Sequence, residues 1–172
     1  TGGQASGACW LDYDNDGWED LFATSYDRTV ADVVRGFTGM NHSLQTNRLF
    51  RNRNGEGFDD KTKEAGLDMV FATMGSNFGD FDNDGFLDMY LGTGEPNLAM
   101  LVPNRMFKNI AGKRFADITA SSGTGNLQKG HGVACGDLPD IGLRDIRFHF
   151  KAGVAQDSDE RRHFVVVYVR YS

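Results

Sequence analysis

The sequence has few of the residues on which membrane-spanning proteins, disulfide-rich proteins and many enzymes are built. No run of eighteen apolar residues occurs in its 172 residues, so it predicts no transmembrane helix. Its two cysteines, Cys9 and Cys135, are expected to be small buried side chains rather than a disulfide. The four histidines share no metal-ligand spacing, and no phosphate loop, Gly-x-Ser-x-Gly elbow or Cys-x-x-Cys is present. These absences favour a non-catalytic protein.

Proline is also scarce, and acidic residues outnumber basic ones. The net charge is -6, which makes nucleic acid an unexpected partner. Three prolines accompany 22 glycines and 13 phenylalanines, a composition that favours short strands and tight turns over long helices. The chain has no signal peptide and no initiator methionine, so we expect it to be a piece of a longer protein.

One acidic stretch occurs twice. Residues 12–20 read DYDNDGWED and residues 80–88 read DFDNDGFLD, which places four aspartates in each stretch of nine residues. Ca²⁺ binds several oxygen ligands and tolerates irregular geometry, so it is the expected counter-ion. Alternate aspartates would point inward, glycine would allow the bend, and a backbone carbonyl would complete the site. The predicted ligands are Asp12, Asp14, Asp16, the Trp18 carbonyl and Asp20, and then Asp80, Asp82, Asp84, the Phe86 carbonyl and Asp88.

These stretches do not fit an EF-hand. Position 12 of an EF-hand loop is a bidentate glutamate, but here it is Ala23 or Leu91. The flanking segments are short and apolar, so each loop is expected to join two strands. Two alternatives remain: an Asp/Asn/Gly turn without a metal, and paired catalytic carboxylates. The alternate spacing within a glycine-bent loop favours the metal.

The repeat extends beyond its acidic loop. The sequence NRLFRN at residues 47–52 returns 57 residues later as NRMFKN, and a Phe-x-Asp segment that begins at Phe58 returns at Phe115. Each unit holds four strand candidates, which in the first unit are residues 8–11, 20–25, 48–51 and 57–61. The Asn54–Gly55 pair is a strong hairpin signal.

Four antiparallel strands per repeat predict an all-β chain of β-propeller blades, about two and a half to three in number. We expect a single propeller segment over residues 1–172. Residues 1–74 would form the first blade with its calcium loop, and residues 75–130 the second blade with its own. Residues 131–172 would form a degenerate third blade. Since a closed propeller needs more blades, the open edges suggest further blades or self-association.

The first unit is lengthened between its second and third strands. The extra residues lie within residues 27–46, where residues 30–34 are expected to form a short helical turn. In a blade this insertion lies at the end opposite the acidic loop. It could carry recognition or be a surface elaboration without a ligand.

The acidic loops, followed by NRLFRN and Phe-x-Asp, resemble FG-GAP/VCBS repeats, the calcium-loop blades of integrin-α-type propellers. More narrowly, they resemble the ASPIC/UnbV and cartilage-acidic-protein-like group. The resemblance implies an extracellular, cell-surface or periplasmic propeller that binds calcium and serves adhesion or recognition of a protein or glycan. It assigns the ligand roles to the same eight aspartates.

The third acidic segment departs from this pattern. Pro139 and Ile141 stand where carboxylates are expected, so two Ca²⁺ ions per chain are predicted rather than three. The favoured function is a non-catalytic calcium-binding module for extracellular binding or adhesion. The alternatives are an accessory propeller of a larger carbohydrate-active enzyme and a purely structural spacer held by calcium.

Overall fold

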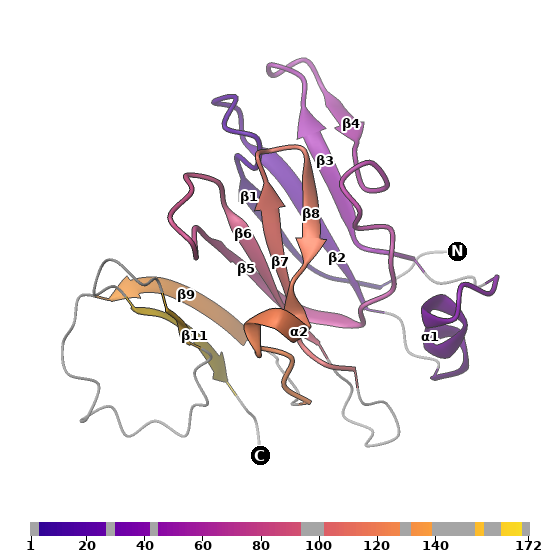
Figure 1. Ribbon diagram of the computed structural model, residues 1–172. Helices are drawn as coiled ribbons and strands as arrows, with labels where there is room; N and C mark the ends of the chain where they lie inside the picture. The colour runs from indigo at the N-terminus through magenta and orange to yellow at the C-terminus, as the bar shows by residue number, and fades with distance from the viewer. Residues whose placement is uncertain are drawn as a thin grey trace.

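The chain is all-β and is built from antiparallel sheets (Figure 1). The computed structural model describes residues 4–26, 30–41, 45–93, 102–127, 132–138, 154–156 and 163–169. The first sheet holds, in spatial order, β1 (Gln4–Leu11), β2 (Asp20–Tyr26), β3 (Arg48–Asn52) and β4 (Phe58–Asp60). The second sheet repeats this order with β5 (Thr73–Gly79), β6 (Asp88–Thr93), β7 (Arg105–Ile110) and β8 (Arg114–Asp117). Two four-stranded meanders in succession are the predicted arrangement of propeller blades, so the fold class is confirmed.

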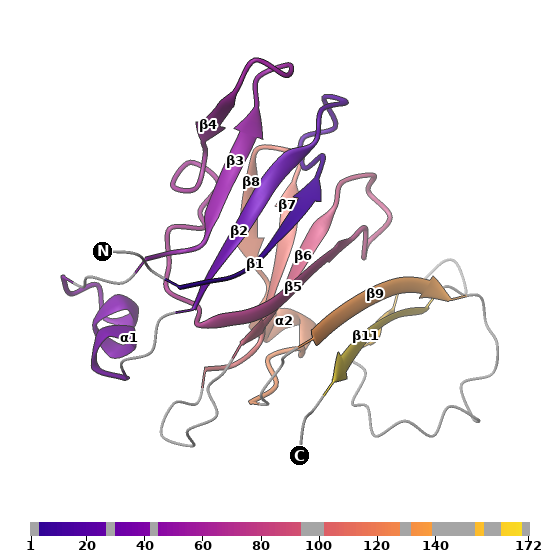
Figure 2. The same ribbon diagram turned by 180° about the vertical axis from the view of Figure 1, so that it is seen from behind.

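A third sheet follows, in which β11 (His163–Val169) pairs on one side with β9 (Gly132–Leu138) and on the other with β10 (Val154–Gln156). It lies next to the second sheet (Figure 2), where the Asn77 side chain donates a hydrogen bond of 3.0 Å to the Val133 carbonyl. The third acidic segment falls mostly on residues 139–145, which lie outside the described residues, so the prediction that it binds no ion stays untested.

The tight turns follow from residues in the left-handed region. Asn54 and Gly55 have φ of 53° and 82°, and Ala111 and Gly112 have φ of 51° and 69°. Two successive positive φ values produce the turn whose twist matches that of the flanking strands. Asparagine and glycine adopt these values readily, whereas Ala111 does so at a cost. The hairpin that the Asn54–Gly55 pair predicts is therefore present, and the second repeat has its counterpart.

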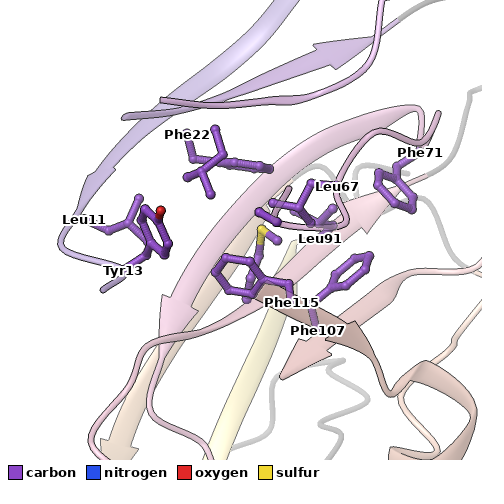
Figure 3. Packing of buried hydrophobic residues seen from close by; sticks show 11 residues of the cluster. Leu11, Tyr13, Phe22, Leu67, Phe71, Leu91, Phe107 and Phe115 are labelled. Atoms are coloured by element: carbon purple, nitrogen blue, oxygen red, sulfur yellow. The ribbon is translucent and has the colours of Figure 1, made fainter. Parts of the chain in front are cut away.

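The main core lies between the first two sheets (Figure 3). Leu11, Phe22 and Leu49 of the first sheet pack in one cluster with Phe107 and Phe115 of the second. Phe22 meets Phe78 edge to face at a centroid distance of 5.6 Å. Burial of a large aromatic side chain stabilises by roughly 1.5–3 kcal/mol, so this cluster fixes the two sheets against each other.

Equivalent positions of the two repeats differ in exposure. Phe115 is 4% exposed, while Phe58, its counterpart in the first sheet, is 45% exposed and contacts Trp10, which is 62% exposed. Phe78, the counterpart of Trp10, is half-buried against the first sheet. The face of the second sheet that carries Phe78 and Phe115 is covered by the first sheet, whereas the corresponding face of the first sheet is exposed.

The predicted insertion contains α1 (Val30–Phe37), which extends the expected helical turn. Figure 1 shows α1 at the opposite end of the first sheet from the β1–β2 and β3–β4 turns, as the sequence predicts. Val33 is buried with Val70, Ala72 and Val102 in a separate small cluster, so α1 is packed onto the protein. A four-residue helix that the sequence did not predict, α2 (Thr119–Ser122), follows β8. Neither helix of the described chain has the length and apolar character needed to cross a membrane.

Candidate metal centre

The two acidic loops have the same backbone conformation. Each joins the first two strands of its sheet, and φ is 58° at both Asn15 and Asn83 and 89° at both Gly17 and Gly85. Asparagine and glycine are the residues that tolerate these values, so the repeated Asn-Asp-Gly sequence produces the same bend twice. The bend predicted at glycine is confirmed, and strands rather than helices flank each loop.

The hydrogen bonds within the loops also repeat. The amides of Asp16 and Gly17 donate to the Asp12 carboxylate at 3.1 and 2.8 Å, and those of Asp84 and Gly85 donate to Asp80 at 3.0 and 2.9 Å. These bonds curl each loop around the carboxylate at its first position. Since a carboxylate oxygen has two lone pairs, it can accept an amide proton and still bind a cation.

Each loop brings three of its four aspartates together. Carboxylate oxygens lie within 4.8 Å of one another in the group Asp12, Asp14 and Asp20 and in the group Asp80, Asp82 and Asp88. Asp16 and Asp84 belong to neither group, and each accepts the backbone N–H two residues further on, that of Trp18 or Phe86. The predicted carbonyl ligands, those of Trp18 and Phe86, stay predictions.

The donor set suits a hard divalent cation. All three atoms of each group are carboxylate oxygens, which Ca²⁺ prefers, and no sulfur or imidazole ligand is among them. Asp14 Oδ1 is buried and accepts no hydrogen bond. A buried acceptor without a partner is costly, and a cation at this point would satisfy it. The residues present therefore fit the metal that the sequence predicts.

The closing aspartates are the most buried carboxylates of the site. Asp20 and Asp88 are 0% and 1% exposed, and burial raises the pKa of each to about 6, against the effect of two backbone N–H donors. Those donors are Tyr13 and Asn52 for Asp20, and Phe81 and Asn109 for Asp88. Burial also raises the pKa of Asp14. An ionised carboxylate in such a place needs a cation nearby.

Sequence reasoning missed two cations that contact the loops. Arg51 Nε lies 2.6 Å from Asp14 Oδ2 and its Nη2 lies 2.8 Å from Asp16 Oδ2. Lys108 occupies the equivalent position of β7 and pairs with Asp82 and Asp84. The signal was the cation that recurs at the fifth position of NRLFRN and NRMFKN.

The first loop is also attached to the second repeat. Asn15 Nδ2 donates to the Gly85 carbonyl at 2.8 Å, which joins the two acidic loops directly. Asn109 Nδ2 donates to the Tyr13 carbonyl at 2.8 Å. A Cβ on Gly112 would lie 2.8 Å from the Cα of Asp14, so the β7–β8 turn packs tightly on the loop. The shape of the first site therefore depends on both sheets.

Comparison with known families agrees with the repeated loops and sheets. Residues 12–91 match the family described as the FG-GAP-like repeat. The matched segment runs from the first aspartate of the first loop into β6, and so covers both acidic loops. It supports FG-GAP-type repeats as the building units of the two sheets. No curated protein matches the chain.

Proposed function

We propose that this chain is a calcium-binding segment of a β-propeller, with one ion at each acidic loop. The observation that carries the proposal is the pair of equivalent carboxylate triads, each built on the same glycine bend and the same backbone hydrogen bonds. Asp12, Asp14 and Asp20 would hold one ion, and Asp80, Asp82 and Asp88 the other. Asp16, Asp84 and the carbonyls of Trp18 and Phe86 would supply further oxygens.

The ion would act as a structural element of the blades. It would neutralise carboxylates that repel one another and would link the ends of the two strands that each loop joins. A ligand that binds only the folded state stabilises it by about 2.7 kcal/mol at a hundredfold excess over its Kd. Because Asn15 joins the first loop to the second, ions at the two loops would also stiffen the contact between the sheets.

We further propose that the segment is non-catalytic and serves binding or adhesion outside the cytoplasm, as the resemblance to integrin-α-type propellers suggests. The narrower resemblance to the ASPIC/UnbV and cartilage-acidic-protein-like group belongs to the same proposal. The match to FG-GAP-like repeats supports it, since such repeats are typical of extracellular or periplasmic proteins. A protein or glycan is the expected class of ligand.

Calorimetric titration with CaCl₂ after thorough chelation tests the metal proposal. We expect two ions per chain and a melting temperature that rises with calcium and falls with chelator. Asp14→Asn should weaken the first site and Asp82→Asn the second, because each removes one charge from a triad while keeping the side-chain size. Asp59→Asn, on exposed β4 outside both loops, is the control. A melting temperature that does not respond to chelation would contradict the proposal.

A further inference from the structure

A cleft of about 480 Å³ lies beside the first acidic loop, between the two repeats. Its lining includes Asp14 and Arg51 from the first repeat and Gly112, Lys113 and Arg114 from the β7–β8 turn and the start of β8. Lys61 and Glu64, which follow β4, also line it. A cleft of this volume suits a small ligand rather than a single ion.

The lining is positively charged in a chain whose net charge is -6. Arg51, Lys61, Lys113 and Arg114 contribute four cations, and Asp14 and Glu64 contribute two carboxylates. Arg51 pairs with Asp14, and Lys61 pairs with Glu64 at 2.7 Å. Within the described part of the chain, no ion pair involves Lys113 or Arg114. These two cations are therefore available to a ligand.

The repeat does not need cations at these positions. In the β3–β4 turn of the first repeat, Asn54 and Gly55 adopt the same left-handed conformation as the corresponding two residues of the β7–β8 turn. It carries Glu56 and Gly57 where the second repeat carries Lys113 and Arg114. The hairpin thus forms with a glutamate and a glycine there, so formation of the turn does not require the two cations.

Both walls of the cleft are held in place. The Phe115 amide donates to the Ala65 carbonyl at 2.9 Å, which joins β8 to the segment after β4. Gly112 packs against the backbone of Asp14, and its amide donates to Asn109 Oδ1 at 2.9 Å. A cleft with fixed walls loses less entropy when a ligand binds than one that must be ordered first.

We propose that this cleft binds the oxyanion group of a small organic acid about the size of a monosaccharide. Arg114 would offer its planar guanidinium to two oxygens of a carboxylate or sulfate, and Lys113 would add a second positive charge. This inference goes beyond the metal proposal. Only its coupling to calcium rests on that proposal: a cation bound at Asp14 would compete with Arg51 and release it toward the cleft.

The test uses the intact chain with sodium sulfate and sodium glucuronate as separate probes, followed by NMR shifts of backbone amides. We expect saturable millimolar binding of at least one probe, with the largest shifts at Gly112, Lys113 and Arg114. The double variant Lys113→Gln and Arg114→Gln should lower the affinity for the bound probe at least tenfold, because charge-assisted hydrogen bonds are lost. The control, Arg35→Gln with Arg48→Gln, removes the same charge at exposed ion pairs elsewhere and should leave binding unchanged.

A second variant, Lys113→Glu, guards against misfolding, because the first repeat accepts Glu56 at this position. It should abolish binding while the melting temperature stays close to that of the wild type. No saturable shift with either probe, or equal losses in the control, would overturn the proposal. Tighter binding with calcium than with chelator would support the coupling. Equal binding in both would leave the anion site standing and count against the release of Arg51.

Discussion

Arg51 and Lys108 are equivalent residues that neutralise part of each acidic loop. A metal ion must compete with them for the same carboxylate oxygens. Their side chains are 40% and 35% exposed, so water screens the ion pairs and each stabilises by about 1 kcal/mol or less. The contacts are therefore weak enough for a divalent ion to displace.

The first prediction is that Arg51→Gln raises the calcium affinity of the first loop by roughly threefold to tenfold, because a competing cation of modest strength is removed. Lys108→Gln should do the same at the second loop. Calorimetric titration checks both, with Arg48→Gln as control because Arg48 pairs with Asp60 outside the loops. A lower affinity in Arg51→Gln would instead show that Arg51 holds the carboxylates in place for the ion.

Asp20 and Asp88 predict how the stability of the folded protein depends on pH. Burial raises the pKa of each to about 6 in the metal-free protein, above the value near 3.9 of an unfolded aspartate. The folded state therefore binds more protons than the unfolded state between about pH 4 and 6, and stability falls as pH rises through this window. The melting temperature in chelator should be higher at pH 5 than at pH 7.

Calcium should reverse this dependence, since it binds the ionised carboxylates and releases their protons. With excess calcium, the melting temperature should rise from pH 5 to pH 7. Asp20→Asn and Asp88→Asn together should flatten the trend in chelator. If the chelated wild type gains stability from pH 5 to pH 7, ionisation of these two aspartates does not govern its stability.

At the scale of elements, the β7–β8 turn and the first loop form one packed unit. Gly112→Ala should place a Cβ 2.8 Å from the Asp14 Cα, in a residue whose φ is already 69°. Gly123→Ala is the matched control, because its φ is 67° and no atom lies within 4 Å of the added Cβ. The control should cost about 1 kcal/mol of unfolding free energy, and Gly112→Ala about 2–4 kcal/mol.

Gly112→Ala should also weaken calcium binding at the first loop and leave the second loop unaffected. Denaturant unfolding in chelator measures the stability, and calorimetry measures the two sites. Equal losses of stability in the two variants would show that the turn is not tightly packed against the loop.

The sequence was sufficient to predict what each repeat does locally. The short apolar runs beside the loops, the Asn54–Gly55 pair and the Asp-x-Asp-Asn-Asp-Gly stretches predicted strands, turns and loops that are present. It was not sufficient for contacts between repeats. Nothing in a single copy shows that Asn15 reaches Gly85, since that contact depends on how two sheets twist and pack. The role of Arg51 was missed for the same reason. The alternation of side chains along a strand predicts the face of the sheet on which a side chain lies, but not which distant residues it contacts.

At the scale of the whole molecule, the two sheets have the same strand order but differ in what covers their faces. The second sheet has neighbours on both faces: the first sheet covers one, and Val133 of β9 packs with Phe81, Tyr90 and Met106 on the other. The first sheet has the second sheet on one face, while Trp10 and Phe58 stand exposed on the other. A propeller blade has a neighbour on each face, so we propose this exposed face as the place for a further blade or a second copy of the chain.

Phe58 and Phe115 make the difference measurable, because they are the same residue at the same position of the repeat. Phe115→Ala should cost about 3–5 kcal/mol of unfolding free energy, the usual loss for a buried phenylalanine. Phe58→Ala should cost less than about 1 kcal/mol at low protein concentration, because its ring is 45% exposed. Denaturant unfolding of both variants in calcium, over a range of protein concentrations, checks this.

If a second copy covers the face, the wild type should gain stability as the concentration rises, and Phe58→Ala should lose that gain. Equal costs at the lowest concentration would mean that Phe58 is already buried in solution, and that the two faces do not differ as the structure has them.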